Sequence, residues 1–347
     1  MQNKRAQGLP INQSHALTIM RSFAILFIVG YWHLFSYTDA FPEYTNWVTH
    51  QMITVVMGIF TFSSGYLLFP KAAHKSPLAF YRNRFIRIYP LFLLAVVCFY
   101  VLGLQSPERL IKAVFLTSTY ALPLPMTLWY VVMLIQLYIL APFLARFCTT
   151  VPRFVLTVAV FIGLHLCLGF FGVPFSSRIL LHFPAFTWGL LLRRRMQGAS
   201  GRIHASLWTV LVVASIGSIA MAMDPIRVPS LRFISHVPLT AVAPTFLFLL
   251  FSQWRMSAIA RVLAPVAYAM YTMYLFHRVL YQILITLYFP EGQLWQVCYL
   301  ACICVPVIFV VSYGIQRTYD LLVHFWPYGM VGSGNVLRKR RTPLQPF

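Results

Sequence analysis

Acidic side chains are almost missing from this 347-residue chain, which has 6 Asp and Glu residues against 27 Lys and Arg. Charged residues of both signs make up only 10% of the sequence, whereas an ordinary soluble domain has roughly 25%. The sequence also lacks a CxxC pair, a glycine-rich phosphate loop, an internal repeat and a low-complexity tract. These absences exclude a disordered chain, a disulfide scaffold and most soluble enzymes.

Apolar residues dominate instead, at 60% of the chain with a mean hydropathy of +0.75. They form about ten runs, each near the roughly 20 residues that cross a bilayer as a helix. We therefore predict an all-α, polytopic membrane helix bundle with about ten transmembrane helices. The predicted spans lie near 16–38, 48–69, 86–104, 127–145, 154–172, 178–193, 204–223, 237–254, 263–289 and 294–325.

The rest of the chain is short and polar, so no separate soluble domain is expected. We predict an N-terminal tail over 1–15, a transmembrane domain over 16–325 and a basic C-terminal tail over 326–347. If the chain starts in the cytoplasm, 19 of the 27 basic residues fall on that side, five on the other and three inside spans. This asymmetry predicts that both termini are cytoplasmic. The net charge of +21 then reflects topology, and no nucleic-acid partner is expected.

The six cysteines lie mostly within apolar runs, where cysteine behaves as a small hydrophobic residue. Cys298, Cys302 and Cys304 form the one cluster, but they lack the usual ligand spacing and an acidic neighbour. We expect them to pack in the membrane and predict no metal site.

Ionisable side chains within a membrane span are costly and are functional candidates by default. The first span contains Arg21 near its cytoplasmic end and His33 beyond its midpoint. Twelve residues separate them by about 18 Å along a helix and by about 120° around it, so they are not a direct pair. His33 is a candidate general base, and a structural histidine bonded to a neighbouring helix is the alternative.

A dense basic cluster opens the third span: Arg82, Arg84 and Arg87, followed by Tyr89. Planar guanidinium groups bind phosphate and pyrophosphate well. The alternative is an ordinary cytoplasmic anchor that contacts lipid headgroups. Weaker candidates inside other spans are Tyr138 and the dipeptide His277-Arg278.

Five segments together resemble the integral-membrane acyltransferase family three, which O-acetylates bacterial surface polysaccharides. The segments are, in order, MRSFAILFIVGYWHLF with Arg21 and His33, GIFTFSSGYLLF with Ser64, YRNRFIRIYP with Arg82, Arg84, Arg87 and Tyr89, LWYVVMLIQLYILAP with Trp129 and Tyr138, and YAMYTMYLFHRVL with His277. Two departures stand out: the acid that often precedes the first arginine is absent, and Gln136 lies where many members have a pair of glutamates.

The resemblance implies a multi-pass enzyme of the bacterial inner membrane that transfers an acetyl or other short acyl group to a glycan. Acyl-CoA would be a co-substrate, with no permanently bound cofactor. Arg82, Arg84 and Arg87 would bind the phosphates of coenzyme A, and Arg21 would bind the donor or shape its entry. His33 would activate the acceptor hydroxyl or carry the acyl group. The acceptor would be a lipid-linked sugar or a nascent polysaccharide, with polysaccharide-assembly proteins as partners. A transporter or flippase for a glycan or small metabolite, and a non-catalytic scaffold, are the alternatives.

Overall fold

The computed structural model describes residues 9–197, 205–223 and 229–325, so most of the predicted N-terminal tail and the whole predicted C-terminal tail lie outside the described residues. Within these ranges every regular element is helical, as predicted. The α-helices are α1 (Ile11–Phe27), α2 (Trp47–His74), α3 (Pro77–Val101), α4 (Pro107–Val114), α5 (Trp129–Phe147), α6 (Val151–Phe170), α7 (Ser177–Met196), α8 (Ala205–Met223), α9 (Val237–Gln253), α10 (Ser257–Leu287), α11 (Gln293–Tyr299) and α12 (Val305–Phe325).

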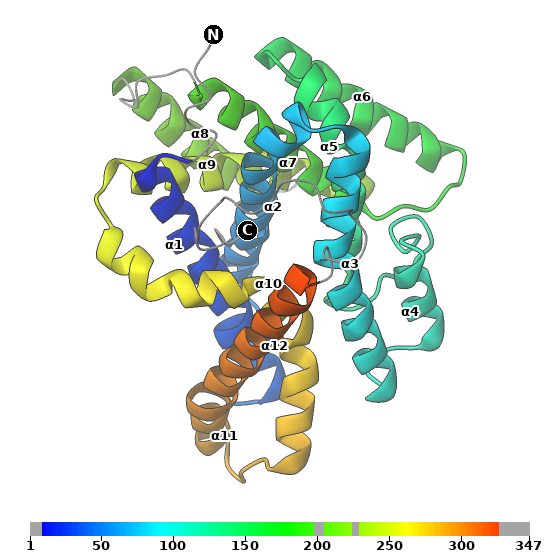
Figure 1. Cartoon of the computed structure of the whole chain (residues 1–347), viewed down its shortest axis with the longest axis vertical. Coiled ribbons are helices and arrows are strands. Elements are labelled where there is room, and N and C mark those ends of the chain that lie inside the picture. The colour runs from blue at the N-terminus through cyan, green and yellow to red at the C-terminus, as the bar shows by residue number, and fades with distance from the viewer. Residues whose placement is uncertain (1–8, 198–204, 224–228, 326–347) are drawn as a thin grey trace.

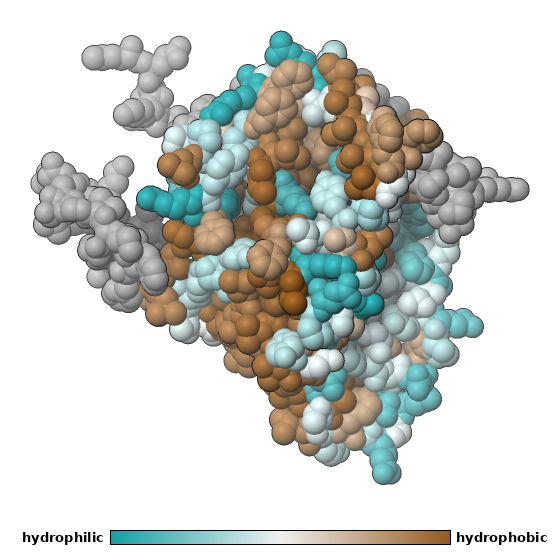
Figure 2. Space-filling view, turned by 90° about the vertical axis from the view of Figure 1, so that its right-hand side faces the viewer, coloured by the Kyte–Doolittle hydropathy of each residue, from teal (hydrophilic) through white to brown (hydrophobic). Residues whose placement is uncertain are grey.

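Eight helical segments are long and apolar enough to cross a membrane, which confirms a multi-pass membrane protein. They span Ile11–Tyr37, Trp47–Ala73, Pro77–Val101, Trp129–Phe147, Val151–Phe170, Phe233–Gln253, Ser257–Leu287 and Gln293–Val323. The remaining two predicted spans correspond to α7, which ends in three arginines, and to α8, whose apolar part is Val212–Ala222. Figure 2 shows a broad apolar surface of the kind that faces lipid.

The central helix is α2, which packs against α7, α9, α1 and α5. Helix α1 lies along α10 and α9, and α10 lies along α12 (Figure 1). Helix α6 is peripheral, with His165 as its one buried residue. The first turn of α2 is fixed by reciprocal hydrogen bonds: the Thr49 N–H donates to Asn46 Oδ1 and the Asn46 N–H donates to Thr49 Oγ1. This capping box sets the position at which His50 enters the bundle.

Helices α2 and α7 approach so closely that two glycines are required at their crossing. A Cβ atom on Gly65 would lie 2.1 Å from the carbonyl oxygen of Phe186, and one on Gly189 would lie 2.4 Å from that of Phe62. Small residues allow such backbone approach between membrane helices, where van der Waals packing replaces the hydrophobic effect. The two glycines therefore fix the distance between two of the helices that line the candidate site described below.

Replacing Gly65 by alanine is expected to destabilise the protein by about 1–3 kcal/mol or more, because the methyl group overlaps the backbone of α7. Gly163→Ala on α6 is the matched control, since nothing lies within 4 Å of that added methyl group. The control should lose no stability, because alanine is the better helix former. Thermal unfolding of both variants in detergent checks the prediction, and equal transition temperatures for the two would contradict it.

The segment before α5 forms the short helix α4, with Ser106 at the N-cap and Pro107 in the first turn. The Ser106 side chain makes no capping hydrogen bond. On the exposed surface of α4, Lys112 Nζ lies 2.6 Å from Glu108 Oε1, and this hydrogen bond lowers the pKa of the Glu108 carboxyl. The Gln136 side chain of α5 donates to the carbonyl oxygen of Leu116 at 2.8 Å. This hydrogen bond ties the loop after α4 to the bundle.

Candidate active site

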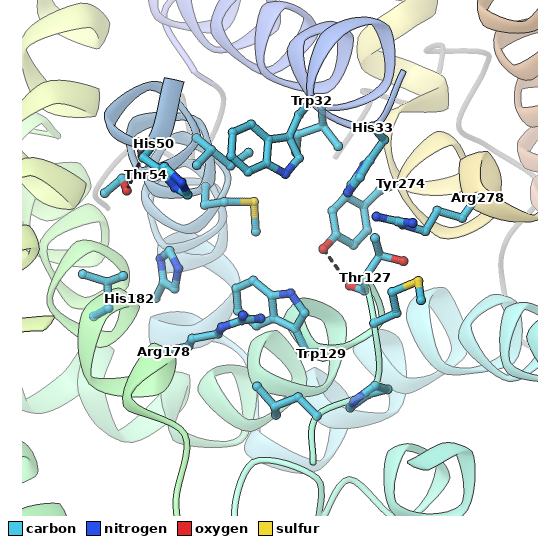
Figure 3. A pocket seen from close by; sticks show the side chains of 17 residues that line it. Trp32, His33, His50, Thr54, Thr127, Trp129, Arg178, His182, Tyr274 and Arg278 are labelled. Atoms are coloured by element: carbon cyan, nitrogen blue, oxygen red, sulfur yellow. Dashed lines mark hydrogen bonds between the residues drawn. The ribbon is translucent and has the colours of Figure 1, made fainter. Parts of the chain in front are cut away.

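A cavity of about 490 Å³ lies between the segment Ile28–His33 that follows α1, the loop before α5, and helices α2, α5, α7 and α10 (Figure 3). Aromatic, imidazole and guanidinium groups face it from different helices. Its lining consists of Ile28, Trp32, His33, His50, Ile53, Thr54, Met57, Leu124, Pro125, Met126, Thr127, Trp129, Arg178, Leu181, His182, Tyr274 and Arg278. A largely apolar pocket with a few convergent polar groups is the usual form of a small-molecule site.

The position of His33 depends on a local change of helix type. Helix α1 continues beyond Phe27 as a π-helical turn, Ile28–His33. Such a turn inserts one extra residue and is frequent at functional sites. The insertion reduces the angle of about 120° between Arg21 and His33 by about 100°. Both side chains are buried, and the wide turn places them on nearly the same face of the helix.

His33 is hydrogen-bonded to His277 of α10, 244 residues away, with 2.8 Å between Nδ1 of His33 and Nε2 of His277. The other ring nitrogen of His277, Nδ1, lies 3.0 Å and 2.9 Å from the carbonyl oxygens of Met273 and Tyr274. Carbonyl oxygens only accept, so Nδ1 of His277 carries the hydrogen and its Nε2 accepts. We therefore assign the hydrogen of neutral His33 to Nδ1, which leaves the lone pair on Nε2.

This arrangement is suited to proton transfer. A histidine whose tautomer is fixed by a second group can take a proton at its other nitrogen, as in hydrolytic triads. In this site an imidazole takes the orienting position that a carboxylate has in those triads. His33 lines the cavity, so its Nε2 is the nitrogen available to a substrate there.

Further hydrogen bonds hold the wall of the cavity in place. The Tyr274 hydroxyl donates to the carbonyl oxygen of Thr127 at 2.7 Å, which joins α10 to the start of α5 (Figure 3). On the opposite wall, Thr61 Oγ1 lies 3.3 Å from both the Tyr130 hydroxyl and Nδ1 of His182. Tyr274 and His182 are thus held in place by contacts with other segments of the bundle.

Two arginines face the same cavity. The guanidinium carbon of Arg178 lies 4.3 Å from the centre of the Trp129 ring. Arg278 extends from α10 toward the cavity (Figure 3) and interacts with the Tyr37 hydroxyl. The Nε atom of Arg278 is buried without a hydrogen-bond partner among the described residues.

A second, smaller cavity of about 40 Å³ contains three basic side chains. It brings together residues from α1, α2, α3 and α5, namely Arg21, Ser63, Ser64, Leu67, Leu68, Lys71, Arg84 and Tyr138. Four of these, Arg21, Ser64, Arg84 and Tyr138, are residues that the sequence singled out. Guanidinium, ammonium and hydroxyl groups around a small space suit an anion such as phosphate.

Three aromatic rings, from α2, α5 and α10, form a cluster beside the larger cavity, and one of them, Tyr274, lines it. Tyr130 lies 5.5 Å from Tyr274 and 6.4 Å from Phe60, measured between ring centres, and Phe60 lies 6.5 Å from Tyr274. On α5, Trp129 lines the larger cavity and Tyr138 lines the smaller one, about 13 Å farther along the helix. The bundle therefore holds a histidine cavity and a cationic cavity at different positions along α5.

Other predicted site residues lie outside both cavities. Arg82 is exposed on α3, and Arg87 is half-buried near Arg84 and Lys71. The Tyr89 hydroxyl donates to the carbonyl oxygen of Val114 at 2.8 Å, so Tyr89 connects α3 to α4. Of the three predicted arginines on α3, only Arg84 reaches the cationic cavity.

Sequence reasoning missed several residues that the structure brings into the site. Lys71 and Arg178 entered the sequence analysis only among the basic residues that indicate topology. In the structure Lys71 lines the cationic cavity and Arg178 lines the histidine cavity. Trp32 and Tyr274 lie within two of the segments that resemble the family, but the sequence did not predict them as site residues. A usable signal was available for Arg178: it follows directly the polar Ser176-Ser177 pair at the start of a span, which places a charge at a helix end.

A membrane helix bundle with an oriented histidine in one cavity and a cluster of cations in another has the features of a membrane-embedded group-transfer enzyme. The chain matches the family model for acyltransferase family 3, described as an acyltransferase domain, over residues 14–317, and it belongs to that family. It is therefore a membrane acyltransferase, as the motif resemblance predicted. Comparisons with curated proteins and with solved structures found no match.

Proposed function

We propose that this protein is an O-acyltransferase of the bacterial inner membrane. It moves an acetyl or other short acyl group from cytoplasmic acyl-CoA to a hydroxyl of a lipid-linked sugar or surface polysaccharide. The observation that carries the proposal is the histidine pair: His277 fixes the tautomer of His33, so that a basic nitrogen is available in the larger cavity. Both termini lie in the cytoplasm in this proposal, as the distribution of basic residues favours.

The reaction follows from this geometry. Nε2 of His33 takes the proton of the acceptor hydroxyl while the hydroxyl oxygen attacks the thioester carbonyl carbon. Negative charge develops on the thioester oxygen, and the Arg278 guanidinium, which lines the same cavity, stabilises it. The carbon–sulfur bond then breaks, and His33 returns the proton to the coenzyme A sulfur.

The same nitrogen of His33 also allows a second route, in which it attacks the thioester itself and carries the acyl group briefly. Rapid acid quenching of the protein with labelled acetyl-CoA in the absence of acceptor distinguishes the routes. Label on the protein that is lost in His33→Gln supports the covalent route, and unlabelled protein supports direct attack.

The donor binds from the cationic side in this proposal. Arg21, Lys71 and Arg84 surround a small cavity whose cations suit one phosphate group, and the cavity is too small for the whole coenzyme. Arg87 and the exposed Arg82 extend the positive surface along α3. The pantetheine arm then passes the cluster of Phe60, Tyr130 and Tyr274, so that the thioester meets the acceptor at His33. Donor and acceptor thus enter from opposite ends of the bundle.

Acetyl transfer to glycans tests the activity. A strain that lacks this protein is expected to lose an ester-linked acetyl group from a surface glycan. Mass spectrometry should then show a glycan that is lighter by about 42 Da for each acetyl group lost. Re-expression of the wild-type chain should restore the ester, and His33→Gln at equal membrane abundance should not. An unchanged set of glycan esters in the deletion strain would contradict the proposed acceptor class.

The cationic cavity is tested by donor binding. Arg84→Gln and Lys71→Gln are each expected to weaken acetyl-CoA binding about tenfold or more, because each removes a charged hydrogen-bond donor to phosphate. Binding of S-acetyl-pantetheine, which lacks the nucleotide phosphates, should be unchanged. Arg146→Gln, at an exposed position near the end of α5, is the matched control. Equal weakening of both thioesters would show that the cavity does not bind phosphate.

A further inference from the structure

We infer that the acceptor is anionic: a carboxylate or phosphate oxygen of the glycan binds Arg178 above Trp129, while the hydroxyl to be acylated lies at His33. This inference rests on the proposed acyl transfer and adds the chemical class of the acceptor. The two sources of such an oxygen are an acidic sugar and the diphosphate of a lipid-linked sugar.

The first observation is the charge of the histidine cavity. Two guanidinium groups, Arg178 and Arg278, line it, and the described residues of the lining include no carboxylate. The acidic residues within the described ranges lie elsewhere, at Asp39, Glu43, Glu108, Glu291 and Asp320. Glu108 is bonded to Lys112, and Asp320 accepts from Tyr268 and Gln316. The protein part of this cavity therefore has an excess of positive charge.

Such an excess has a physical consequence. Cations taken partly out of water in a membrane bundle are paired, hydrated or used to bind a ligand of opposite charge. The contact with Tyr37 orients Arg278 and the contact with Trp129 orients Arg178, but neither contact neutralises a charge. An anionic substrate supplies the missing charge when it enters the cavity.

The second observation is the geometry at Arg178. Its guanidinium carbon lies 4.3 Å from the centre of the Trp129 ring, close enough for a cation–π contact. This contact holds the planar group in a fixed orientation, which favours binding of two oxygens of one carboxylate or phosphate. Trp32 lines the same cavity and adds an apolar surface for a sugar ring.

The third observation is the placement of the two arginines. Figure 3 shows Arg178 and Arg278 on different sides of the cavity, with His33 on the side of Arg278. An acceptor whose anionic group binds at Arg178 thus extends across the cavity, and its hydroxyl reaches the histidine. In this arrangement Arg278 stabilises the thioester oxygen, and Arg178 binds the anionic group that distinguishes the acceptor from neutral glycans.

The test uses the full-length protein in lipid nanodiscs and compares four ligands by equilibrium binding. A glucuronate-containing disaccharide is paired with its glucose counterpart, and a short polyprenyl diphosphate glucose is paired with the uncharged polyprenyl glucoside. At least one anionic ligand is expected to bind tenfold or more tightly than its neutral partner, with the difference reduced by added salt. The pair that shows the difference identifies the source of the anionic oxygen.

Arg178→Gln is expected to remove that preference, and Arg178→Lys to retain part of it because the charge remains. Arg109→Gln, on α4 and outside the cavity, should leave the preference intact. The inference is overturned if neither anionic ligand binds more tightly than its neutral partner in the wild type. It is also overturned if Arg178→Gln still binds the anionic ligand more tightly than its neutral partner. If Arg178→Gln does not fold, the comparison of anionic and neutral ligands in the wild type decides alone.

Labelled acetyl-CoA separates this inference from the proposed function. Arg178-dependent binding of an anionic ligand without any acetyl transfer would refute the acyltransferase proposal for glycans and leave the anion site standing. Transfer to neutral glycans at a rate that Arg178→Gln does not change would refute the anionic acceptor and leave acyl transfer standing.

Discussion

Replacing His33 by glutamine is expected to lower the rate of acyl transfer by about 10²–10⁴-fold, the usual contribution of a general base. Glutamine retains a polar group near His277 but has no nitrogen that can take a proton at neutral pH. His33 is buried in the wall of the cavity, so water is a poor substitute for its basic nitrogen. Release of coenzyme A from acetyl-CoA in the presence of acceptor measures the rate.

His15→Gln is the matched control, because His15 lies on the same helix outside the histidine cavity. This control should keep the wild-type rate. Acetyl-CoA affinity should be unchanged in His33→Gln, since the cationic cavity is formed by other residues. A His33→Gln rate within about threefold of the wild type, far below a general base's contribution, would exclude His33 as the base.

Replacing His277 by phenylalanine is expected to reduce kcat by about 10²-fold or more and to leave the KM for acceptor nearly unchanged. His277 touches no substrate in this proposal; it is a positioning residue that accepts the hydrogen of His33 Nδ1. Without that acceptor, His33 can rotate or place its hydrogen on Nε2, and the wrong tautomer has no lone pair toward the cavity. Loss of the corresponding orienting group in a serine protease costs about 10⁴-fold.

His277→Gln provides the test of this role, because its side-chain oxygen can accept a hydrogen bond. It should recover part of the rate that His277→Phe loses, and the pH dependence of kcat should differ between the two variants. A purely structural His277 predicts instead that both variants lose stability and activity in parallel. Thermal unfolding measured alongside the rates separates these outcomes.

Much of the fold was predictable because hydropathy is a local property of the chain. Each predicted span corresponds to a helix, since about 20 apolar residues can satisfy their backbone hydrogen bonds in lipid only as a helix. The Ser106-Pro107 start of α4 was predictable for a similar reason, because it depends on two adjacent residues. The hydropathy of α7 is a weaker guide to whether it spans the membrane. Its three terminal arginines lower its average hydropathy, although most of its residues are buried.

The candidate site was predictable in its components but not in its grouping. Arg21, Arg84, Ser64 and Tyr138 were recognised in separate motifs, and the structure brings them to one cavity. Arg82 belongs to the same motif as Arg84, yet it is exposed, because residues two apart on a helix point in different directions.

The sequence by itself determined that this is a multi-pass helical membrane protein of an acyltransferase family, and it identified His33 as a candidate base. Only the tertiary structure decided that His33 is oriented by His277, that Arg178 faces the same cavity, and that Arg21, Lys71 and Arg84 meet in a separate cationic cavity. The physical reason is that these arrangements depend on helix packing over long separations. The close approach at Gly65 and Gly189 and the π-helical turn before His33 set that packing, and neither can be read from the hydropathy of the chain.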